Sequence, residues 1–209
     1  MRMLDLFCGE GLAAWGYWLS GRFTEIVGVD TNNEMRDRYS FDFVKMSAGD
    51  CTYDFLAQFD FIHASPPCQG YSNATPDQSL HQRLVAATHL MLYAIGKPYV
   101  IENVEGSSKE LRPNIVMDGH YFGLPSERRR YFHASTLARP LRLMSSGRTI
   151  NVHGGDYVSR QSLIEALGLD VINARRLSNL TMAGMEQGIA PAMTKYIAEA
   201  LFPNKTLIG

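Results

Sequence analysis

The sequence predicts an α/β fold in which helices cover both faces of a mostly parallel sheet. Two observations lead to this fold. Short apolar runs of strand length alternate with longer amphipathic runs through the first half of the chain, and this alternation is typical of consecutive βαβ units. The chain also has 209 residues, which suffices for one full domain with its own hydrophobic core.

The N-terminal elements follow in order from local patterns. Residues 3–7 form an apolar run that predicts a buried strand, and a glycine-containing turn at 8–11 ends it. Residues 12–19 then predict a helix. The next apolar run predicts a second strand over 25–29, followed by a second helix over 32–41 and a short third strand over 43–46.

The remaining elements are less evenly spaced. A fourth strand is expected over 60–64, and it ends at Ser65-Pro66-Pro67 because proline cannot donate to a strand ladder. A helix over 81–95 and a fifth strand over 99–103 complete the alternating part. Residues 135–175 are richer in Arg, Ser and Gly and lack this rhythm, and residues 190–202 predict a final helix.

Composition limits the class of protein. Hydrophobic residues make up 45% and charged residues 20%, as in ordinary globular domains. No apolar stretch is long enough for a membrane span, and acidic residues in the first apolar segment argue against a signal peptide. The three cysteines have no metal-site spacing and fit a reducing compartment. We therefore expect a cytoplasmic protein, in the host cytoplasm if a phage encodes it, without a metal or a membrane partner.

The net charge is −1, but the charge is unevenly distributed. Residues 123–180 contain nine arginines and only four acidic residues. Arginine is the side chain best suited to phosphates and to guanine edges. This segment therefore indicates contact with nucleic acid, whereas a solvated surface of scattered charge is the simpler alternative.

One end of the predicted sheet has the features of a cofactor site. Gly9 and Gly11 let the backbone approach a ligand closely. Asp30 follows the second strand, where an acidic residue typically holds ribose hydroxyls, and Asp50 follows the third, where a carboxylate can accept from an adenine amino group. The third glycine of the dinucleotide fingerprint is missing, which favours S-adenosylmethionine over NAD.

The most specific segment is Pro66-Pro67-Cys68, after the fourth strand. Proline restricts the backbone, so Cys68 is expected to be exposed and rigidly held. A thiolate that adds to C6 of cytosine activates C5 for methylation, which needs an acid at N3 and donors near O2. Glu102, at the next strand end, can supply the acid, and Arg128 and Arg130 can supply the donors.

Four segments together resemble the motifs of the cytosine-C5 DNA methyltransferase family. They occur in the family's order along residues 3–134: Asp5-Leu6-Phe7-Cys8-Gly9-Glu10-Gly11, Pro66-Pro67-Cys68-Gln69-Gly70-Tyr71-Ser72, Glu102-Asn103-Val104 and Gly123-Leu124-Pro125-Ser126-Glu127-Arg128-Arg129-Arg130. The resemblance implies a Rossmann-like class I S-adenosylmethionine-dependent methyltransferase fold with a small extra target-recognition excursion. It also implies a flipped-out target base, with residues 69–79 as a mobile lid.

The resemblance assigns residues to three groups. The catalytic group has Cys68 attacking C6, Glu102 at N3 and Arg130 at the base O2, supported by Arg128 and Pro67. The cofactor group is Asp5, Phe7, Gly9, Gly11, Leu12, Asp30, Asp50 and Pro66. The nucleic-acid group is Gln69, Ser72, Arg139, Arg142, Arg148 and Arg160, whose phosphate contacts would weaken with salt.

The chain departs from the family's pattern in several places. Ser126 stands where the family usually has Gln, and Asp30 where Glu is commoner. Residues 187–191 only loosely match the family's Gly-Asn-x-x-Pro motif. We divide the chain into a catalytic and cofactor-binding core (1–134), a reduced target-recognition region (135–175) with a turn at Gly154-Gly155, and a C-terminal segment (176–209) that packs back on the core.

Three functions fit these observations. The leading hypothesis is a small orphan or phage-type DNA cytosine-C5 methyltransferase that acts on double-stranded DNA, alone, as a dimer or with a partner subunit, in restriction–modification or in regulation. The second is a tRNA methyltransferase with the same catalytic residues. The third is a non-catalytic, cofactor-binding partner subunit, against which intact Cys68 and Glu102 argue.

Overall fold

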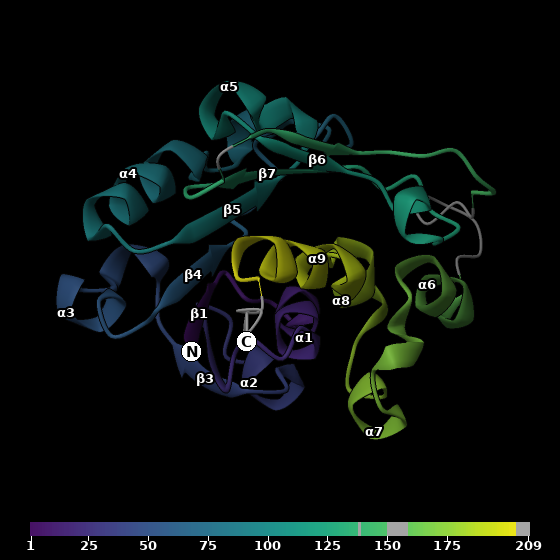
Figure 1. Cartoon of the computed structure of the whole chain (residues 1–209), viewed down its shortest axis with the longest axis horizontal. Helices are drawn as coiled ribbons and strands as arrows, with labels where there is room; N and C mark the ends of the chain where they lie inside the picture. The colour runs from purple at the N-terminus through teal and green to yellow at the C-terminus, as the bar shows by residue number, and fades with distance from the viewer. Residues whose placement is uncertain (138, 150–158, 204–209) are drawn as a thin grey trace, which may run out of the picture.

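The computed structural model describes residues 1–137, 139–149 and 159–203. An eight-stranded sheet with the order β3-β2-β1-β4-β5-β7-β6-β8 forms its centre (Figure 1). β7 pairs antiparallel with β5 and β6, and the other neighbours pair in parallel. This confirms the expected mostly parallel sheet. The strands are β1 (Arg2–Leu6), β2 (Glu25–Asp30), β3 (Asp42–Lys45), β4 (Phe61–Ala64), β5 (Tyr99–Asn103), β6 (Ile115–Met117), β7 (Arg130–Ala134) and β8 (Leu141–Leu143).

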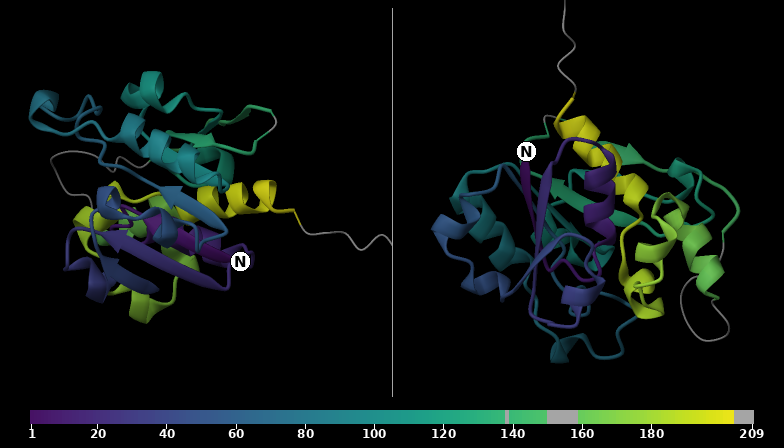
Figure 2. Two further views of the ribbon diagram at one scale, coloured as in Figure 1. Left: turned by 90° about the vertical axis from the view of Figure 1, so that its left-hand side faces the viewer. Right: turned by 90° about the horizontal axis from the view of Figure 1, so that it is seen from below.

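Helices cover both faces of this sheet, and α1 and α9 lie side by side (Figures 1 and 2). The α-helices are α1 (Leu12–Leu19), α2 (Met35–Arg38), α3 (Tyr53–Leu56), α4 (Val85–Ile95), α5 (Ser108–Leu111), α6 (Arg160–Leu167), α7 (Ala174–Leu177), α8 (Met182–Gln187) and α9 (Pro191–Leu201). Short 3-10 turns are η1 (Ala48–Asp50), η2 (Gln78–Leu80), η3 (Glu105–Ser107), η4 (His120–Phe122) and η5 (Leu169–Val171).

Two hydrophobic clusters flank the sheet because successive strand residues point to opposite faces. In β1, Met3 packs in the cluster shared with α1 and α9, whereas Leu4 packs in the cluster under α3, α4 and α5. The same alternation separates Val100 from Ile101 in β5. Polar residues at strand positions therefore face one helical layer or the other, which fixes what each can reach.

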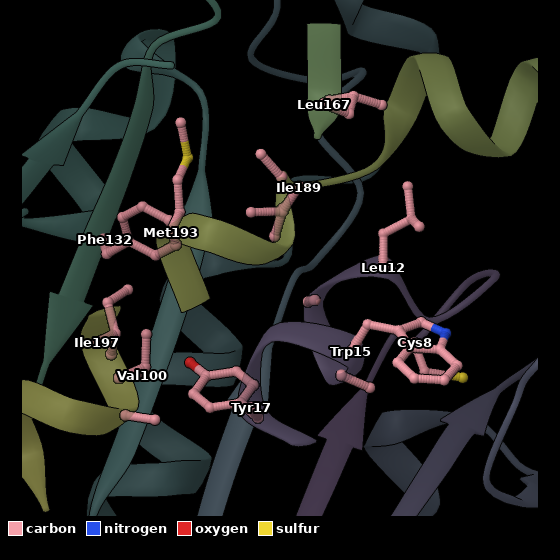
Figure 3. Packing of buried hydrophobic residues seen from close by; sticks show 14 of the residues in the cluster. Cys8, Leu12, Trp15, Tyr17, Val100, Phe132, Leu167, Ile189, Met193 and Ile197 are labelled. Carbon is pink, nitrogen blue, oxygen red and sulfur yellow. The ribbon is translucent and has the colours of Figure 1, made fainter. Parts of the chain in front are cut away.

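The contact between α1 and α9 is unusually close. A side chain at Gly16 would collide with Thr194 and with the carbonyl oxygen of Pro191. The Thr194 hydroxyl donates to the carbonyl oxygen of Ala13 at 2.8 Å, which joins the two helices by a buried hydrogen bond. Figure 3 shows Tyr17 of α1 with Ile197 of α9 and Val100 of β5 in this layer. The first and last helices thus share one core.

Two helices are shorter than expected. The second begins at Met35, because Asn32 caps a turn by accepting from the Glu34 amide, and ends before Tyr39, whose backbone is extended. The helix expected over 81–95 begins only at Val85. There the Val85 amide donates to the Tyr71 hydroxyl at 3.1 Å, and residues 81–84 form a loop instead.

Part of the segment 135–175 contributes to the main core. β8 extends the sheet beside β6, and Leu163, Leu167 and Leu169 pack in the cluster of α1 and α9. The expected turn at Gly154-Gly155 lies outside the described residues. The longest exposed run of this segment within the described residues is the stretch after β8, residues 144–149.

No helix among residues 1–137, 139–149 and 159–203 combines the length and apolar character that crossing a bilayer requires. No His, Cys, Asp and Glu cluster in these ranges is arranged to hold a metal ion.

Gly16→Ala is expected to destabilise the fold by about 1–3 kcal/mol, because the added methyl group must push α9 away from α1. Urea unfolding monitored by circular dichroism measures this change. Gly49→Ala is the matched control, since a side chain there meets only Ser47 Oγ at 3.7 Å. Equal stability of the two variants would contradict close packing at Gly16.

Candidate active site

A cleft of about 600 Å³ opens at the carboxyl ends of β1, β2, β4 and β5. Ligand sites of open α/β sheets are expected at this edge. The loops after these strands line the cleft, together with Arg130 and the C-terminal segment around α8. Predicted site residues that line it are Asp5, Phe7, Gly9, Gly11, Leu12, Asp30, Pro66, Pro67, Cys68, Gln69, Glu102 and Arg130.

The turn after β1 has an unusual backbone. Phe7, Gly9 and Gly11 have φ angles of 58°, 49° and 86°, all in the left-handed region. A side chain at Gly11 would also meet the Tyr39 ring at 2.8 Å. Left-handed backbone costs roughly 1–2 kcal/mol for a residue such as Phe7. The structure maintains this turn at the edge of the cleft, where backbone strain often marks a functional site.

Asp30 ties this turn to β2. Its carboxylate accepts from the Gly9 amide at 3.1 Å and from the Asn32 amide at 2.9 Å. Each oxygen keeps a further lone pair, so Asp30 can still accept from a ligand hydroxyl in the cleft. Asp30 therefore both shapes the turn and offers a ribose contact.

Asp5 lies deeper, at the end of β1. It is almost fully buried and accepts from the Tyr39 hydroxyl at 3.0 Å. Burial raises the pKa of Asp5 well above its usual range. Asp5 lies at the floor of the cleft, and one of its carboxylate oxygens is already hydrogen-bonded to Tyr39.

Asp50 occupies a different place from the one expected. Asp50 is exposed and does not line the cleft, whereas Met46, Ser47 and Ala48 line it. The cause is η1, whose first turn is capped by Ser47 Oγ accepting from the Gly49 amide. The structure therefore does not bring Asp50 together with the other predicted cofactor residues.

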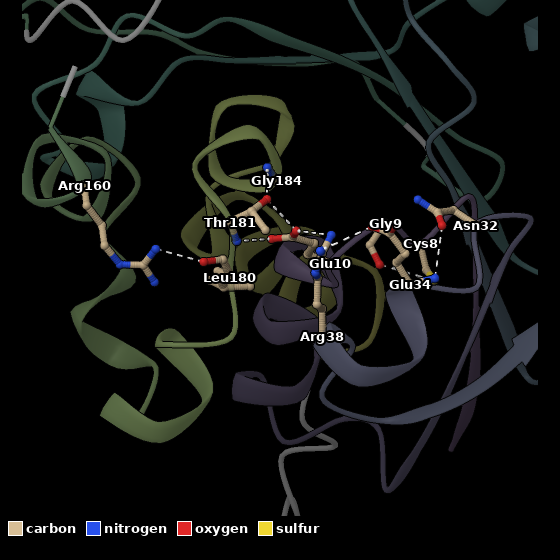
Figure 4. Close-up of polar contacts among 10 residues, drawn as sticks. All are labelled: Cys8, Gly9, Glu10, Asn32, Glu34, Arg38, Arg160, Leu180, Thr181 and Gly184. Atoms are coloured by element: carbon tan, nitrogen blue, oxygen red, sulfur yellow. Dashed lines mark hydrogen bonds and ion pairs between the residues drawn. The ribbon is translucent and has the colours of Figure 1, made fainter. Parts of the chain in front are cut away.

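Glu10 joins the first turn to the C-terminal segment (Figure 4). Its carboxylate accepts from the Thr181 amide at 2.7 Å and from the Thr181 hydroxyl at 2.6 Å, and Arg38 Nη1 lies 3.5 Å away. The same threonine caps α8 by accepting from the Gly184 amide at 2.9 Å. Because Thr181 and Gly184 line the cleft, this contact closes its cofactor side.

Cys68 is half-buried at the other end of the cleft. Asn103 holds the preceding loop, because its amide nitrogen donates to the carbonyl oxygen of Pro66 at 2.8 Å. Burial, and next the nearby Glu102, raise the pKa of the Cys68 thiol, while Arg130 and Arg128 oppose this increase. The thiol is therefore the resting form at neutral pH.

Glu102 and Arg130 form a buried ion pair beside Cys68. Arg130 Nε lies 3.1 Å from Glu102 Oε1, and the two side chains are only 12% and 9% exposed. Burial raises the pKa of Glu102, whereas Arg130 and a hydrogen bond from Ser65 lower it. A carboxyl group balanced in this way can take up and release a proton in the cleft.

Arg128 has a different role from the one expected. Its guanidinium donates to the carbonyl oxygens of Met185 and Glu186 at the end of α8, and it does not line the main cleft. Burial, and next the neighbouring Arg130, lower its pKa to about 9. Arg128 thus holds α8 against the segment before β7 rather than facing a substrate base.

The loop after Cys68 is fastened to α5. The Tyr71 hydroxyl donates to Glu110 at 2.7 Å, and Arg83 pairs with Glu110 at 2.9 Å while lying over the Tyr71 ring. Arg83 also donates to the carbonyl oxygen of Gly70 at 2.8 Å. Gln69 lines the cleft but Ser72 does not, and Gln82 and Leu84 line it again before α4, so the two ends of this loop face the site.

The arginines expected to contact nucleic acid differ in exposure. Arg139, Arg142 and Arg148 are exposed beside and after β8. Arg160 donates instead to the carbonyl oxygens of Leu177 and Leu180, so it anchors α6 to the loop before α8 (Figure 4). Arg160 is therefore occupied within the fold, and we no longer assign it to phosphate.

Several residues that shape the site were not expected from the sequence. Glu10 and Thr181 are 171 positions apart, so no local pattern connects them. His63 did carry a signal, because it lies within an otherwise apolar strand, and Ser65 directly follows that strand. Polar side chains buried at such positions usually have a specific partner.

A family model described as C-5 cytosine-specific DNA methylase matches residues 1–110, just over half of the chain. No curated protein sequence matches this chain. The Entamoeba histolytica methyltransferase EhMeth is similar in structure, with a TM-score of 0.63 at 14% identity over 97% of this chain and 98% of that one. At this identity the likeness concerns the fold, and it confirms the expected Rossmann-like methyltransferase fold.

Two further structures are less similar. The Dnmt2 methyltransferase of S. pombe has a TM-score of 0.48 at 18% identity, over 64% of this chain and 48% of that one. A DNA modification methyltransferase encoded within a prophage of E. coli has a TM-score of 0.48 at 20% identity, over 63% of this chain and 45% of that one. This chain spans less than half the length of either.

Glu102→Gln is expected to speed alkylation of Cys68 by iodoacetamide about three- to tenfold at pH 7.5. Removing the negative charge lowers the raised pKa of the thiol, and half to one pKa unit corresponds to this factor. Arg130→Gln should slow alkylation for the opposite reason. Mass spectrometry of the digested protein locates the label, with buried Cys8 and Cys51 as internal controls. A slower reaction in Glu102→Gln would contradict this account of the site.

Proposed function

The chain belongs to the C-5 cytosine-specific DNA methylase family, and we propose that it transfers a methyl group from S-adenosylmethionine to C5 of cytosine in double-stranded DNA. The observation that carries the proposal is the common cleft. Cys68 and the Glu102–Arg130 ion pair line one end of it, and Asp30 with the turn after β1 lines the other. The methyl donor and the target base would therefore bind next to each other in one cleft.

The cofactor end suits S-adenosylmethionine in its chemistry. Asp30 offers carboxylate lone pairs for ribose hydroxyls, Phe7 and Leu12 offer apolar surface, and the turn at Gly9 lets the backbone come close. When bound there, S-adenosylmethionine supplies an electrophilic methyl group. The Glu10–Thr181 contact keeps α8 over this end, so the residues of the last third of the chain contribute to the pocket.

The substrate end suits cytosine. The Cys68 thiol gives its proton to water as its sulfur bonds to C6. The electron pair of the C5–C6 double bond then forms a C4–C5 double bond, and the C4–N3 electron pair moves to N3. Glu102 donates a proton at N3, and Arg130 stabilises charge at O2 while it holds Glu102 in place. C5 then takes the methyl group as N3 returns its proton to Glu102, and a water molecule removes the C5 proton as the Cys68 sulfur leaves, which restores the C5–C6 double bond and a thiolate.

The base reaches this cleft only outside the DNA stack, and extrusion costs roughly a few kcal/mol. Exposed Arg139, Arg142 and Arg148 are our candidates for the phosphate contacts that offset this cost. Gln69, at the cleft edge after Cys68, is a candidate for contact with the nucleotide itself.

We expect the purified protein to form 5-methylcytosine in duplex DNA with labelled S-adenosylmethionine. Cys68→Ala should abolish the product, and Glu102→Gln should lower the rate about 10²–10⁴-fold, the usual contribution of an acid catalyst. Cys51→Ala is the matched control, because Cys51 is buried away from the cleft lining and its loss should leave activity intact. Digestion and chromatography of the product measure each rate.

Other outcomes of this experiment are equally informative. Methylation of tRNA and not of DNA would replace the substrate in the proposal and keep the chemistry. Cofactor binding without any product would favour a missing partner subunit or a non-catalytic role. Product formation by Cys68→Ala would contradict the covalent mechanism.

Thr181→Ala should weaken S-adenosylmethionine binding about tenfold and also destabilise the fold by about 1 kcal/mol, since it removes an α8 cap and a Glu10 contact. Calorimetric titration and urea unfolding measure the two effects. Thr52→Ala removes a comparable cap from α3, and because Thr52 does not line the cleft, it should cost stability without affecting affinity. If the affinity of Thr181→Ala for S-adenosylmethionine were unchanged, α8 would not contribute to the cofactor site.

A further inference from the structure

The loop after Cys68 leaves the core and returns to it at two residues that touch. No residue from 72 to 84 is buried, whereas Tyr71 before this stretch and Val85 after it are both buried. The Val85 amide donates to the Tyr71 hydroxyl at 3.1 Å, which joins the two ends. Within the part of the chain that the structure describes, residues 73–82 form hydrogen bonds only with residues 72–82. The position of the loop therefore depends on its base.

Three side chains fasten this base, and we call Tyr71, Arg83 and Glu110 the clamp. The Tyr71 hydroxyl donates to Glu110 Oε2 at 2.7 Å. Arg83 donates to the other carboxylate oxygen, from Nε at 3.0 Å and from Nη2 at 2.9 Å. Its Nη1 donates to the carbonyl oxygen of Gly70 at 2.8 Å, and its guanidinium carbon lies 4.2 Å from the centre of the Tyr71 ring. The two oxygens of Glu110 thus bond one residue at each end of the loop.

Glu110 is ionised in the clamp. Burial raises the pKa of its carboxyl group, but the hydrogen bonds from Tyr71 and Arg83 outweigh burial, and the pKa lies below its usual value. An ionised carboxylate accepts with both oxygens, whereas a protonated carboxyl group would turn a donor toward one of these partners. The clamp is therefore complete at neutral pH.

The segment after β5 holds the chain on both sides of Cys68. Before it, the Asn103 amide nitrogen donates to the carbonyl oxygen of Pro66. After it, the carbonyl oxygen of Cys68 accepts from the Tyr71 amide at 2.9 Å. A side chain at Gly106 would collide with the Tyr71 carbonyl oxygen, so this turn lies directly against η3. Cys68 is therefore fixed between two attachments, and the clamp secures the second.

We propose that Tyr71, Arg83 and Glu110 are positioning residues, whose clamp holds Cys68 at the cleft and lets the loop of residues 72–82 change its conformation without moving the nucleophile. The consequence for catalysis rests on the proposed role of Cys68 as the attacking group. The sulfur thereby keeps its place relative to the cofactor end of the cleft, whatever position the loop takes.

Alkylation of Cys68 by iodoacetamide is the first test, because it needs no substrate. Glu110→Gln and Arg83→Gln each break the ion pair of the clamp, and each should speed the reaction about three- to fivefold, since a loosened turn exposes the half-buried thiol. The two substitutions change the charge in opposite senses, so an increase in both excludes a simple effect on the Cys68 pKa.

Glu25→Gln is the matched control for this test. It breaks an ion pair of similar exposure, with Arg2 at 2.7 Å, where β1 and β2 begin at the opposite end of these strands from the cleft. The alkylation rate of Cys68 should stay unchanged in this variant. Unchanged rates in both clamp variants, or an equal increase in Glu25→Gln, would overturn the proposal.

Hydrogen exchange followed by NMR locates the loosened segment. Tyr71→Phe removes the hydroxyl and keeps the buried ring, and it should speed exchange of the Val85 amide and of the amide at position 71 about tenfold. The amide of Thr75, which is bonded to Ser72 inside the loop, should exchange at its original rate. Equal acceleration at Thr75, or no change at position 71, would contradict a clamp that acts at the base of the loop.

Methyl transfer gives a third readout if the proposed function holds. Glu110→Gln should lower kcat about tenfold, because the nucleophile is no longer held in line with the bound base. KM for S-adenosylmethionine should change by less than about twofold, since the cofactor residues line the other end of the cleft. A raised KM with an unchanged kcat would assign the clamp to binding and overturn its positioning role.

These measurements distinguish the clamp from the proposed function. Alkylation and exchange need no methyl transfer, so their failure overturns the clamp alone, whereas a protein with an intact clamp that forms no 5-methylcytosine contradicts only the proposed function. Urea unfolding reports the global stability of each variant. Arg83→Gln alters an exposed residue and keeps the test available if Tyr71→Phe unfolds.

Discussion

The buried ion pair between Glu102 and Arg130 constrains the rest of the site. Two charges removed from water cost several kcal/mol each, and only close geometry with further hydrogen bonds offsets this. Arg130 can reach Glu102 because β7 is inserted antiparallel beside β5, where Glu102 pairs in register with Phe132. The reversal in the sheet thus brings an arginine from the second half of the chain to the strand end that carries the acid.

The surroundings of this pair follow from it. Arg128, two residues earlier, is turned toward the end of α8, where carbonyl oxygens take its donors. Ser65, in the loop that also carries Cys68, helps to lower the pKa of the Glu102 carboxyl group. Glu102 and the end of α8 are therefore both held by the short segment from Arg128 to Arg130.

The sequence predicted the sheet and which residues stand at its strand ends, and the reasons are local. Apolar runs and the turns after them placed Cys68, Glu102, Asp30 and Gly9 at strand ends, and the structure brings them to one cleft. What it missed depends on a local turn in one case and on contacts between separate segments in two others. Asp50 was displaced by a 3-10 turn, Arg160 found carbonyl partners on a loop, and Glu10 meets Thr181 from the other end of the chain.

The residue roles themselves stay predictions, as do the limits of the recognition region. Leu163 and Leu167 show why these limits were hard to place from sequence: a segment rich in Arg and Ser also holds a helix whose apolar side completes the main core. Composition describes the exposed face of such a segment, whereas its few buried leucines decide where it packs.

The pairing of α1 with α9 has a consequence for synthesis. α1 is formed from residues 12–19, but the helix that covers it ends at Leu201. During translation, at roughly 5–20 residues per second, the apolar side of α1 waits on the order of ten seconds or more for its partner. The nascent chain therefore exposes the surface around Tyr17 and Ala13 until late, and a chaperone that shields it would act early on the ribosome, well before the cleft exists.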